Sequence, residues 1–279
     1  MARKIMMLID TSRCIGCKAC QVACKQWHSL PAEATSFNGS YTNPPALSKS
    51  TLTFVKFSET LVNSKLRFLF FKKQCLHCNQ ARCLIRCPKG GDKMSGGLVV
   101  FNNNCKPANI ILKAKEKKAL KNGTWGPGTG KLYPNWPSGV PAPSTYPFGE
   151  FMTPPVTFLG PELAFLKEVM SNPLTGCLHG VPALDPAIDG SFKKCDFCAD
   201  RFEGGNYTTY RDGYPTTACE LTCPSNAILT DDAGAIMTEA RKRLSTVKRQ
   251  YRMAGLWGGR GRVIYLLTES ASNYGLSKI

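Results

Sequence analysis

Short apolar runs, separated by polar, glycine-rich or proline-rich stretches, give the chain its pattern. Six of these runs predict strands, because brief apolar or alternating segments bounded by turn-forming residues are typical of β-structure. The predicted strands cover residues 5–9, 51–57, 66–71, 98–101, 225–229 and 263–267. The second of them alternates between apolar and polar positions, as expected of a half-buried strand.

A helical period is clearest over residues 231–254. Apolar residues recur there on one face of the expected helix, namely at Ile236, Ala240, Leu244, Val247 and Tyr251. Asp231 or Asp232 can cap its start. Basic residues are expected to cover the other faces: Arg241, Lys242, Arg243, Lys248, Arg249 and Arg252. We interpret the apolar stripe as a docking face rather than as a contact with a cofactor.

The stretch between residues 106 and 176 has the least regular pattern. Residues 110–121 predict a basic helix, and residues 161–171 predict a short helix with Pro161 suited to its first turn. Residues 122–155 are rich in glycine and proline, which argues against packed helices or central strands. A loop of this length is usually functional or bound to a partner. Its aromatic residues would therefore anchor it either to another subunit or to its own domain.

Cysteine changes this picture, because the 279 residues include 14 cysteines. A secreted disulfide scaffold would be shorter and would carry a signal peptide. The apolar run after Arg3 and Lys4 is too short for a signal peptide, and no segment approaches the roughly 20 apolar residues of a membrane span. Most cysteines instead form a first, a middle and a last group with the spacing of metal ligands: Cys14-x2-Cys17-x2-Cys20-x3-Cys24, Cys75-x2-Cys78-x4-Cys83-x3-Cys87, and Cys195-x2-Cys198 followed by Cys219-x3-Cys223.

The spacing in the first and last groups predicts two [4Fe–4S] clusters. A cubane needs thiolates at the corners of a tetrahedron, and a tight loop with a cysteine at every third position reaches three corners. The fourth cysteine, one helical turn further on, points away and ligates the other cluster in two-cluster ferredoxins. This exchange assigns one ligand set to the first cluster, namely Cys14, Cys17, Cys20 and Cys223. It assigns a second set to the second cluster, namely Cys24, Cys195, Cys198 and Cys219.

The middle group predicts a third cluster. Its loop supplies three ligands: Cys75, Cys78 and Cys83. We assign Cys177 as the fourth ligand, because it resembles the surviving last cysteine of a degenerate further group. The cluster of that further group would need Cys87, Cys105 and two cysteines that the sequence lacks. Because two thiolates cannot hold a cubane, we predict three clusters and not four. Cys87 and Cys105 then remain as free thiols or packing residues, with a rearranged site as the alternative.

Zinc is the alternative occupant of any Cys-x2-Cys pair. A zinc ribbon uses two such pairs per metal, whereas the first group places too many thiolates in one loop, so iron–sulfur is favoured. The histidines near the ligands are interpreted as hydrogen-bond donors to the cluster surroundings rather than as ligands: His28, His77 and His179. Nearby cations are expected to raise the cluster potentials: Lys18, Lys25, Lys73 and Arg82.

The order of the elements predicts an α+β fold of tandem bacterial-ferredoxin-like modules. A strand, a cysteine loop, a helical turn and a second strand occur twice, which is the pseudo-two-fold pattern of ferredoxins. The expected division is 1–30 with 190–230 for a module with two clusters, 31–105 with 177–189 for a degenerate module with one cluster, 106–176 for a long irregular insertion, and 231–279 for a C-terminal helix and strand.

The formal charge of +17 at first suggests a nucleic-acid partner. Cluster ligation by thiolates would lower the charge of the loaded protein to about +11. The basic residues are scattered and no nucleic-acid motif accompanies them, so we expect a solvated surface and an acidic protein partner rather than nucleic acid.

The residues around the cysteines resemble those of the iron–sulfur (beta) subunits of formate dehydrogenases. These subunits transfer electrons in the molybdenum/tungsten-bis-pterin oxidoreductases. The resemblance covers residues 5–90 and 177–268 and rests on three motifs: Cys14-Ile-Gly-Cys-Lys-Ala-Cys-Gln-Val-Ala-Cys-Lys-Gln-Trp-His28, Lys194-Cys-Asp-Phe-Cys-Ala-Asp-Arg201 and Ala218-Cys-Glu-Leu-Thr-Cys-Pro224. Asn43-Pro44-Pro45 and the reduced cluster count are most similar to the soluble tungsten enzymes, whose small subunit holds three cubanes.

This resemblance implies an electron-transfer subunit that works with a large molybdopterin or tungstopterin catalytic subunit. A further electron carrier or a membrane subunit is a second expected partner. The sequence itself contains no nucleophile–base pair, phosphate loop or pterin motif, so no catalytic residue is assigned. Three alternatives remain open, namely the same module in another bis-pterin or tungsten oxidoreductase (aldehyde, polysulfide or nitrate type), a free polyferredoxin, and a zinc-structured binding protein. The lack of an export signal favours the cytoplasm, whereas export in the folded state with the catalytic subunit would give a periplasmic protein.

Overall fold

The computed structural model describes two compact units. The described residues are 4–37, 39–94, 96–106, 109–114, 117, 169–170, 177, 181–184, 191–202, 215–258 and 260–276. Unit 1 comprises Met1–Gln80, Lys93–Val100 and Lys194–Ile279, and unit 2 comprises Ala81–Asp92 and Phe101–Lys193. The helices expected at 110–121 and 161–171, and most of the insertion at 106–176, lie outside the described residues.

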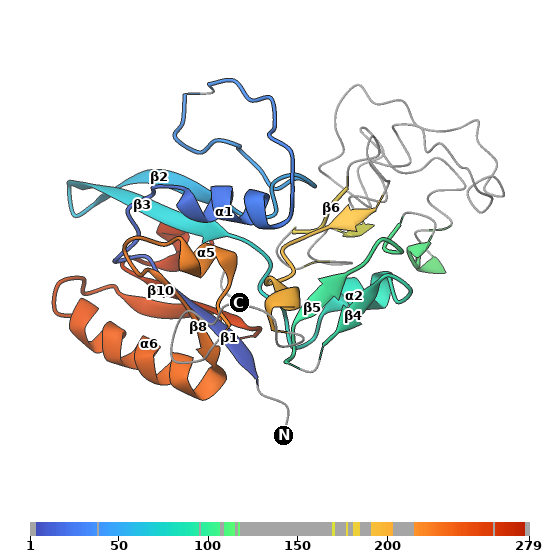
Figure 1. Ribbon diagram of the computed structural model, residues 1–279. Helices are drawn as coiled ribbons and strands as arrows, with labels where there is room; N and C mark the ends of the chain where they lie inside the picture. The colour runs from blue at the N-terminus through green and yellow to red at the C-terminus, as the bar shows by residue number, and fades with distance from the viewer. Residues whose placement is uncertain are drawn as a thin grey trace. The chain divides into compact units, whose positions relative to one another are not determined.

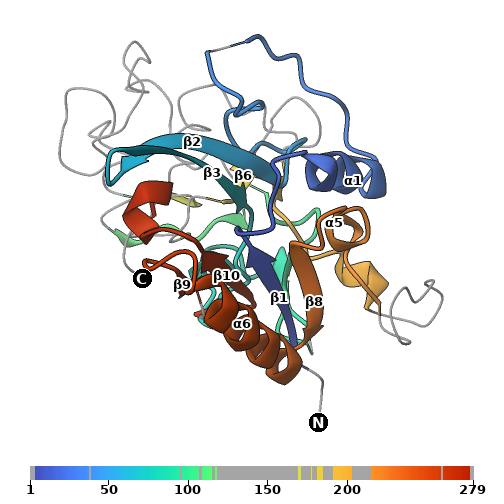
Figure 2. The same ribbon diagram turned by 90° about the vertical axis from the view of Figure 1, so that its left-hand side faces the viewer.

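A four-stranded sheet with the strand order β8-β1-β10-β9 forms the centre of unit 1 (Figures 1 and 2). Its strands are β1 (Ile5–Asp10), β8 (Ile228–Asp232), β9 (Gly255–Gly258) and β10 (Val263–Leu267). β1 is parallel to β10 and antiparallel to β8, whereas β9 is antiparallel to β10. β1 is buried on both faces, so that alternate residues contribute to two different hydrophobic clusters.

One face of this sheet is covered by α6 (Ala233–Val247), which runs along it in both ribbon views. Ile236 and Ala240 are buried against the sheet, and Leu244 and Val247 pack beside them. The predicted apolar stripe is therefore a docking face for the chain's own sheet. The cap is Asp232, whose Oδ1 accepts the Gly234 N–H at 2.8 Å. The helix ends at Val247, earlier than expected, because the chain then turns toward β9.

The other face of the sheet packs against a long hairpin of β2 (Phe54–Val62) and β3 (Lys65–Lys73). Both strands extend beyond the segments expected at 51–57 and 66–71. They are joined by Asn63 and Ser64, which both have positive φ, as a two-residue type I′ turn requires. The Phe71 ring stacks on Tyr265 of β10 with centroids 4.5 Å apart, which fixes the hairpin to the sheet.

Shorter elements complete the described chain. They are α1 (Ala19–Trp27), α2 (Arg82–Arg86), β4 (Gly91–Lys93), β5 (Val99–Phe101), β6 (Ala183–Leu184), β7 (Phe192–Lys193), η3 (Ala199–Arg201), α5 (Ala218–Leu221) and η4 (Ala271–Tyr274). This mixture of helices and strands agrees with an α+β fold, and the tandem pseudo-two-fold arrangement stays a prediction. The division into modules stays a prediction. Unit 1 contains residues 31–80 of the predicted degenerate module (31–105 with 177–189) together with the predicted C-terminal part (231–279). No helix in the described ranges is long and apolar enough to cross a membrane.

Arg243 differs most from expectation, because it is buried instead of lying on the surface of α6. Its Nη1 lies 3.3 Å from Oδ2 of Asp10, which is fully buried at the end of β1. The same Nη1 donates to the carbonyl of Asn226 at 3.1 Å, just before β8, and Nε pairs with Glu239 at 2.8 Å. Arg243 therefore ties α6 to the ends of the two strands that adjoin the first and last cysteine groups.

We expect Arg243→Met to lower the free energy of unfolding by about 2 kcal/mol, because the buried Asp10 carboxylate then keeps only its ion pair with the half-exposed Arg13, whose Nε lies 3.5 Å from Asp10 Oδ2. Lys242→Met, at a 79% exposed neighbour on the same helix, should change it by less than about 0.5 kcal/mol. Anaerobic denaturant unfolding of the iron-loaded protein measures both. Equal effects would show that the buried pair does not stabilise this end of the sheet.

Candidate iron–sulfur sites

Each of the three Cys-x2-Cys loops contains the same left-handed turn. The residue before the second cysteine has positive φ in every case, with values of 67° at Gly16, 49° at His77 and 70° at Phe197. Such a turn directs consecutive backbone N–H groups to one side and forms a concavity that binds anions, as in many iron–sulfur sites. The N–H of His77 contacts Cys75 Sγ at 3.4 Å, so this loop already directs a backbone donor at a thiol sulfur.

Gly16 is the position where the turn leaves no room for a side chain. A Cβ atom there would lie 2.4 Å from the ring of Phe70 on β3. The first cysteine loop is therefore pressed directly against the hairpin. Alternation along β3 places Phe70 and Lys72 on the same face of the strand, toward this loop.

The first predicted ligand set comes together where β1 ends and β8 begins. These strands pair antiparallel, with Ile9 opposite Ile228, so that the loop after β1 meets the turn before β8. The N–H of Ala227 contacts Cys223 Sγ at 3.3 Å. Burial raises the pKa of the Cys14 thiol, and the negative charge of Cys223 raises it further, so these two residues are close enough for their charges to interact.

This first set opens toward the surface. Cys17 is exposed, and Cys14 and Cys223 are half-buried, whereas Cys20 on α1 is buried. Large aliphatic side chains beside these cysteines in the sequence are also exposed: Ile15, Val22 and Leu221.

The second predicted set lies deeper, between α1 and α5. These helices pack together, and they carry Cys24 and Cys219. All four members of the set are buried. Burial raises the pKa of Cys24 well above its usual value, and the nearby charges of Cys195 and Cys219 raise it further. The structure thus places Cys24 beside cysteines of the last group.

Lys72 is a buried cation between the two sets, and the sequence interpretation missed it. Only 2% of the residue is exposed, and its ammonium donates to the neutral amide oxygen of Gln74. Burial lowers its pKa, but the thiolate charges of four cysteines from both sets outweigh burial and raise it: Cys219, Cys20, Cys195 and Cys24. A buried ammonium is expensive without negative charge nearby. A pair of thiolate-ligated clusters fits this requirement, whereas neutral thiols do not.

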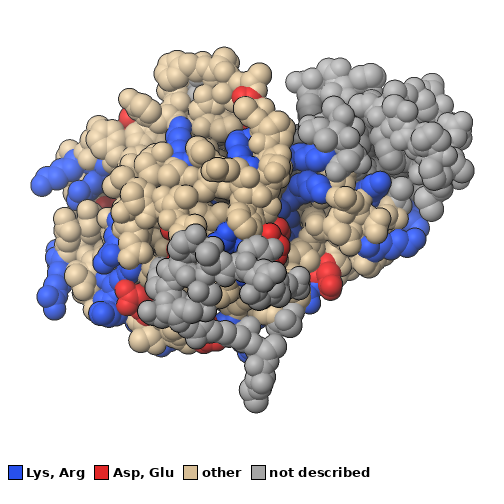
Figure 3. Space-filling model, viewed as in Figure 1, with Lys and Arg blue, Asp and Glu red and all other residues tan. Residues whose placement is uncertain are grey.

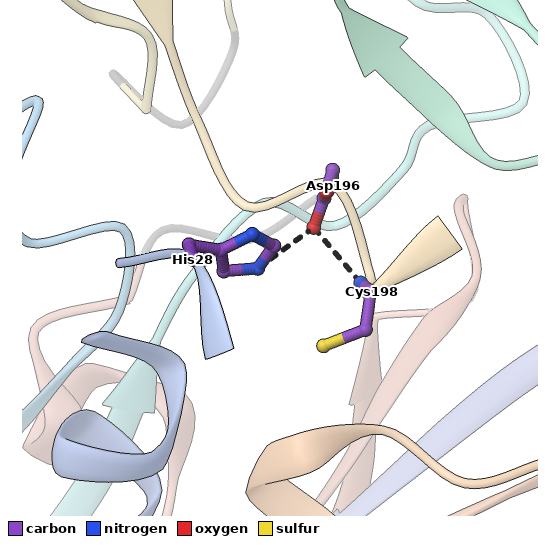
Figure 4. Close-up of side chains that lie close together, drawn as sticks. All are labelled: His28, Asp196 and Cys198. Carbon is purple, nitrogen blue, oxygen red and sulfur yellow. Dashed lines mark hydrogen bonds and ion pairs between the residues drawn. The ribbon is translucent and has the colours of Figure 1, made fainter. Parts of the chain in front are cut away.

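The last residues of the first motif also contact the last cysteine motif, and Figure 4 shows this contact for His28, Asp196 and Cys198. His28 Nε2 lies 3.2 Å from Asp196 Oδ1, which also accepts the Cys198 N–H at 2.8 Å. Burial lowers the pKa of His28, but the hydrogen bond and the charge of Asp196 outweigh burial and raise it. These donor atoms lie within 4.8 Å of one another, as a metal site requires. We interpret the arrangement as a structural contact that holds the loop between Cys195 and Cys198 in place, because the Asp196 carboxylate already binds the His28 ring and the Cys198 N–H.

A second contact joins the same two motifs. The Arg201 guanidinium carbon lies 4.3 Å from the ring centre of Trp27, and the Trp27 indole donates to Asp200 at 3.1 Å. The motif residues beyond the cysteines therefore hold the two groups side by side.

The predicted third set is divided between the two units. Cys75 and Cys78 lie in unit 1, and Cys83 and Cys177 lie in unit 2, so the assignment of this set stays a prediction. The pKa of Cys195 is raised to about 12, mainly by burial, although the charge of Lys72 lowers it. The charge of Cys75 also raises the pKa of Cys195, so Cys75 lies near the second set.

The remaining predicted residues have varied roles. His77 is buried, and its Nδ1 accepts the Val99 N–H at 2.9 Å, so this nitrogen is committed to the backbone. His179 lies outside the described residues. Lys18 and Lys25 donate to loop carbonyls, including Asn43 at 3.4 Å and Pro31 at 3.1 Å, respectively. On the face in Figure 3, Lys and Arg side chains are scattered among uncharged ones.

Comparison with known proteins gives several relatives. A family model for a 4Fe–4S binding domain matches residues 5–26. Formate dehydrogenase 2 subunit beta (cytochrome c-553) of Nitratidesulfovibrio vulgaris is 30% identical over 270 residues, covering 96% of this chain and 94% of the relative. The beta subunit of the Megalodesulfovibrio gigas formate dehydrogenase is 25% identical, covering 95% and 94%. The iron–sulfur subunit of the nitrate-inducible formate dehydrogenase of Escherichia coli is 28% identical, covering 95% and 68%.

We expect Gly16→Ala to lower both the iron content and the thermal unfolding midpoint, because the added Cβ must displace Phe70. The left-handed backbone adds about 1–2 kcal/mol of strain. Gly39→Ala is the matched control, since Gly39 also has positive φ but has no atom within 4 Å of the added Cβ. Iron analysis and calorimetry of both variants separate the contact from the strain. If the two variants lost iron equally, contact with the hairpin would not matter.

Proposed function

This chain belongs to the iron–sulfur (beta) subunits of formate dehydrogenases, and we propose that it relays electrons through three [4Fe–4S] clusters to or from a large molybdenum- or tungsten-pterin catalytic subunit. The proposed complex oxidises or forms formate at that partner. The present chain would contribute ligands, insulation and electrostatic tuning, and no catalytic residue.

The single observation that best supports the proposal is the succession of cysteine sets within unit 1. Cys20 of the first set interacts electrostatically with Cys219 of the second. Cys195 of the second set interacts in the same way with Cys75 of the middle group. Electron transfer from cluster to cluster requires neighbouring clusters to lie close together, and this row of neighbouring cysteine sets suits it. A zinc-stabilised binding protein would have no evident use for such a row.

We propose the ligand sets that the exchange of cysteines predicts. The first cluster would be held by Cys14, Cys17, Cys20 and Cys223. The second would be held by Cys24, Cys195, Cys198 and Cys219. The third would be held by Cys75, Cys78, Cys83 and Cys177. When bound, each cluster supplies reversible one-electron transfer.

The residues of the chain have three tasks in this proposal. Backbone N–H groups of the left-handed turns stabilise the sulfur ligands. The core around Phe197 and Tyr265 excludes water from the second set. Lys72 supplies positive charge to two sets at once and favours the reduced state of each cluster. The more open first set, with Cys17 at the surface, is the proposed point of exchange with an outside carrier.

Three finer assignments belong to the same proposal. The tungsten type is favoured by the segment Asn43-Pro44-Pro45 and the predicted count of three clusters. Location in the periplasm would require export together with the catalytic subunit, and otherwise the complex is cytoplasmic. A further electron carrier would receive the electrons from the relay.

Isolation of the complex through a tag on this chain tests the function. We expect a large subunit containing molybdenum or tungsten, about twelve iron atoms per copy of this chain, and cluster reduction on addition of formate. An iron-loaded complex that formate leaves oxidised would contradict the formate assignment alone. Colourless, zinc-containing protein would contradict the electron-transfer role.

Single substitutions test the exchange of ligands between groups. Cys223→Ser should remove the first cluster and leave the second, whereas Cys24→Ser should do the reverse, so each variant should lose about four iron atoms. Electron paramagnetic resonance of the reduced variants identifies the missing signal. If both variants lost the same signal, Cys24 and Cys223 would ligate one cluster and the proposed sets would be wrong.

Removal of the buried cation tests the tuning role. We expect Lys72→Met to lower the midpoint potentials of the first and second clusters, because reduction adds negative charge near Lys72. A unit charge about 8 Å away contributes about 2 kcal/mol at an effective dielectric constant of about 20, or roughly 90 mV for a one-electron couple. Lys65→Met, at the exposed far end of the same strand, should shift neither potential. A redox titration showing no difference between the variants would contradict the role of Lys72.

A further inference from the structure

His77, in the middle cysteine loop, has one buried hydrogen-bonding atom that the protein does not satisfy. The residue is 0% exposed. Its Nδ1 accepts the N–H of Val99 at 2.9 Å, so this nitrogen carries no proton and Nε2 bears the single N–H of a neutral ring. Among the residues that the structure describes, none accepts a hydrogen bond from Nε2. A buried N–H group without an acceptor is costly and rare in native proteins, so this one calls for an explanation.

The His77 side chain contacts the loop of a different predicted cluster. The backbone N–H of His77 faces its own loop, where it contacts Cys75 Sγ at 3.4 Å. The ring instead packs edge-to-face against Phe197, with centroids 5.0 Å apart and planes at 79°. Phe197 occupies the same place in the loop between Cys195 and Cys198, directly before the second cysteine and with positive φ. The backbone of His77 therefore belongs to one loop, and its imidazole lies against another.

Lys194 holds the two loops together at this point. Its ammonium donates to the carbonyl of Val99 and to the carbonyl of Cys195, the latter at 3.1 Å. Burial and the charge of Lys194 lower the pKa of His77 well below its usual value, whereas contact with the Cys195 backbone acts in the opposite direction. The Cys195 carbonyl is thus near the imidazole. It already accepts the Lys194 ammonium, and it forms no hydrogen bond with Nε2.

Cluster sulfur is the acceptor that this N–H lacks. The sulfur atoms of an iron–sulfur cluster accept hydrogen bonds, and these bonds influence the reduction potential. In the ligand sets proposed above, Cys195 and Cys198 hold the second cluster, whereas the loop that contains His77 holds the third. Because the imidazole lies against the loop between Cys195 and Cys198, the nearer sulfur atoms are those of the second cluster. A side chain that served only to pack the two loops would have no use for the N–H.

We propose that the Nε2–H of His77 donates a hydrogen bond to a sulfur atom of the second cluster, although His77 lies in the loop that would ligate the third. This inference rests on the ligand sets of the proposed function. The donor stabilises the more negative, reduced state of the second cluster and so raises its potential. His77 is then a tuning residue, through which the loop of one cluster sets the potential of its neighbour.

His77→Asn removes the donor with little other change. Asparagine tolerates the positive φ of 49° and keeps an acceptor for the Val99 N–H, but it has no N–H at the place of Nε2. Because a net hydrogen bond is worth about a factor of ten in an equilibrium, we expect about a tenfold fall in the ratio of reduced to oxidised second cluster at a fixed potential. This fall corresponds to about 59 mV for one electron. The first and third clusters should not change, whereas Lys72→Met should affect the first as well.

His77→Gln is the matched rescue variant. Its amide N–H reaches the place of Nε2, but the Val99 N–H loses its acceptor. We therefore expect the potential of the second cluster to return toward that of the parent, while the thermal unfolding midpoint falls below that of His77→Asn. A redox titration of the full iron-loaded chain in its complex, followed by electron paramagnetic resonance, measures the potentials. If the potential followed stability across the three proteins, His77 would act through packing alone and the proposal would be overturned.

Pulsed electron paramagnetic resonance with ¹⁵N-labelled histidine identifies the acceptor. The signal of the second cluster, which is the one that Cys24→Ser removes, should show coupling to a nitrogen nucleus and to an exchangeable proton, and His77→Asn should lose both. The same couplings on the third cluster, or none in the parent, would overturn the proposal. Full iron content with an unchanged second-cluster potential in His77→Asn would overturn this inference alone. Absence of iron from the parent would overturn the proposed function and this inference with it.

Discussion

Thiolates buried away from water are unstable unless positive charge and hydrogen bonds compensate them, and this constraint organises unit 1. Burial is the largest cause that raises the pKa of Cys20 and Cys195 to about 12; neighbouring negative charges raise both pKa values further, and Lys72 lowers them. Both thiols therefore need help from their surroundings to ionise at physiological pH. The structure supplies that help in two forms. Left-handed turns direct N–H groups at the sulfurs, and the ammonium of Lys72 lies between the two sets. Cluster iron would provide the rest of the positive charge.

The remainder of the fold holds distant cysteine loops together. Pairing of β1 with β8 joins the two ends of the chain, and α1 packs against α5 beside it. Arg243 fixes the ends of both strands from the opposite face of the sheet. Contacts of Trp27 and His28 with Arg201 and Asp196 lock the motif tails. The hairpin carries Lys72 and presses Phe70 against the first loop, so it contributes both charge and shape to the relay.

Local patterns in the sequence were sufficient to locate most strands, because the alternation of a strand depends on short-range spacing. β10 was predicted at its observed bounds, and Asp232 was one of two predicted caps. Lys72 and Arg243 were not predicted to be buried, because a charged residue in a strand or helix normally faces water. Only tertiary contacts reveal their environments, namely thiolates around Lys72 and the Asp10 carboxylate beside Arg243.

The most direct measurement of the central claim is the anomalous scattering of iron in crystals of the loaded complex, because it locates each cluster without altering a ligand. The account predicts one cluster bounded by Cys14, Cys17, Cys20 and Cys223 and another bounded by Cys24, Cys195, Cys198 and Cys219, with Lys72 between them. A cluster that joins Cys223 to Cys195 and Cys198, or density for a single zinc ion at either site, would contradict it.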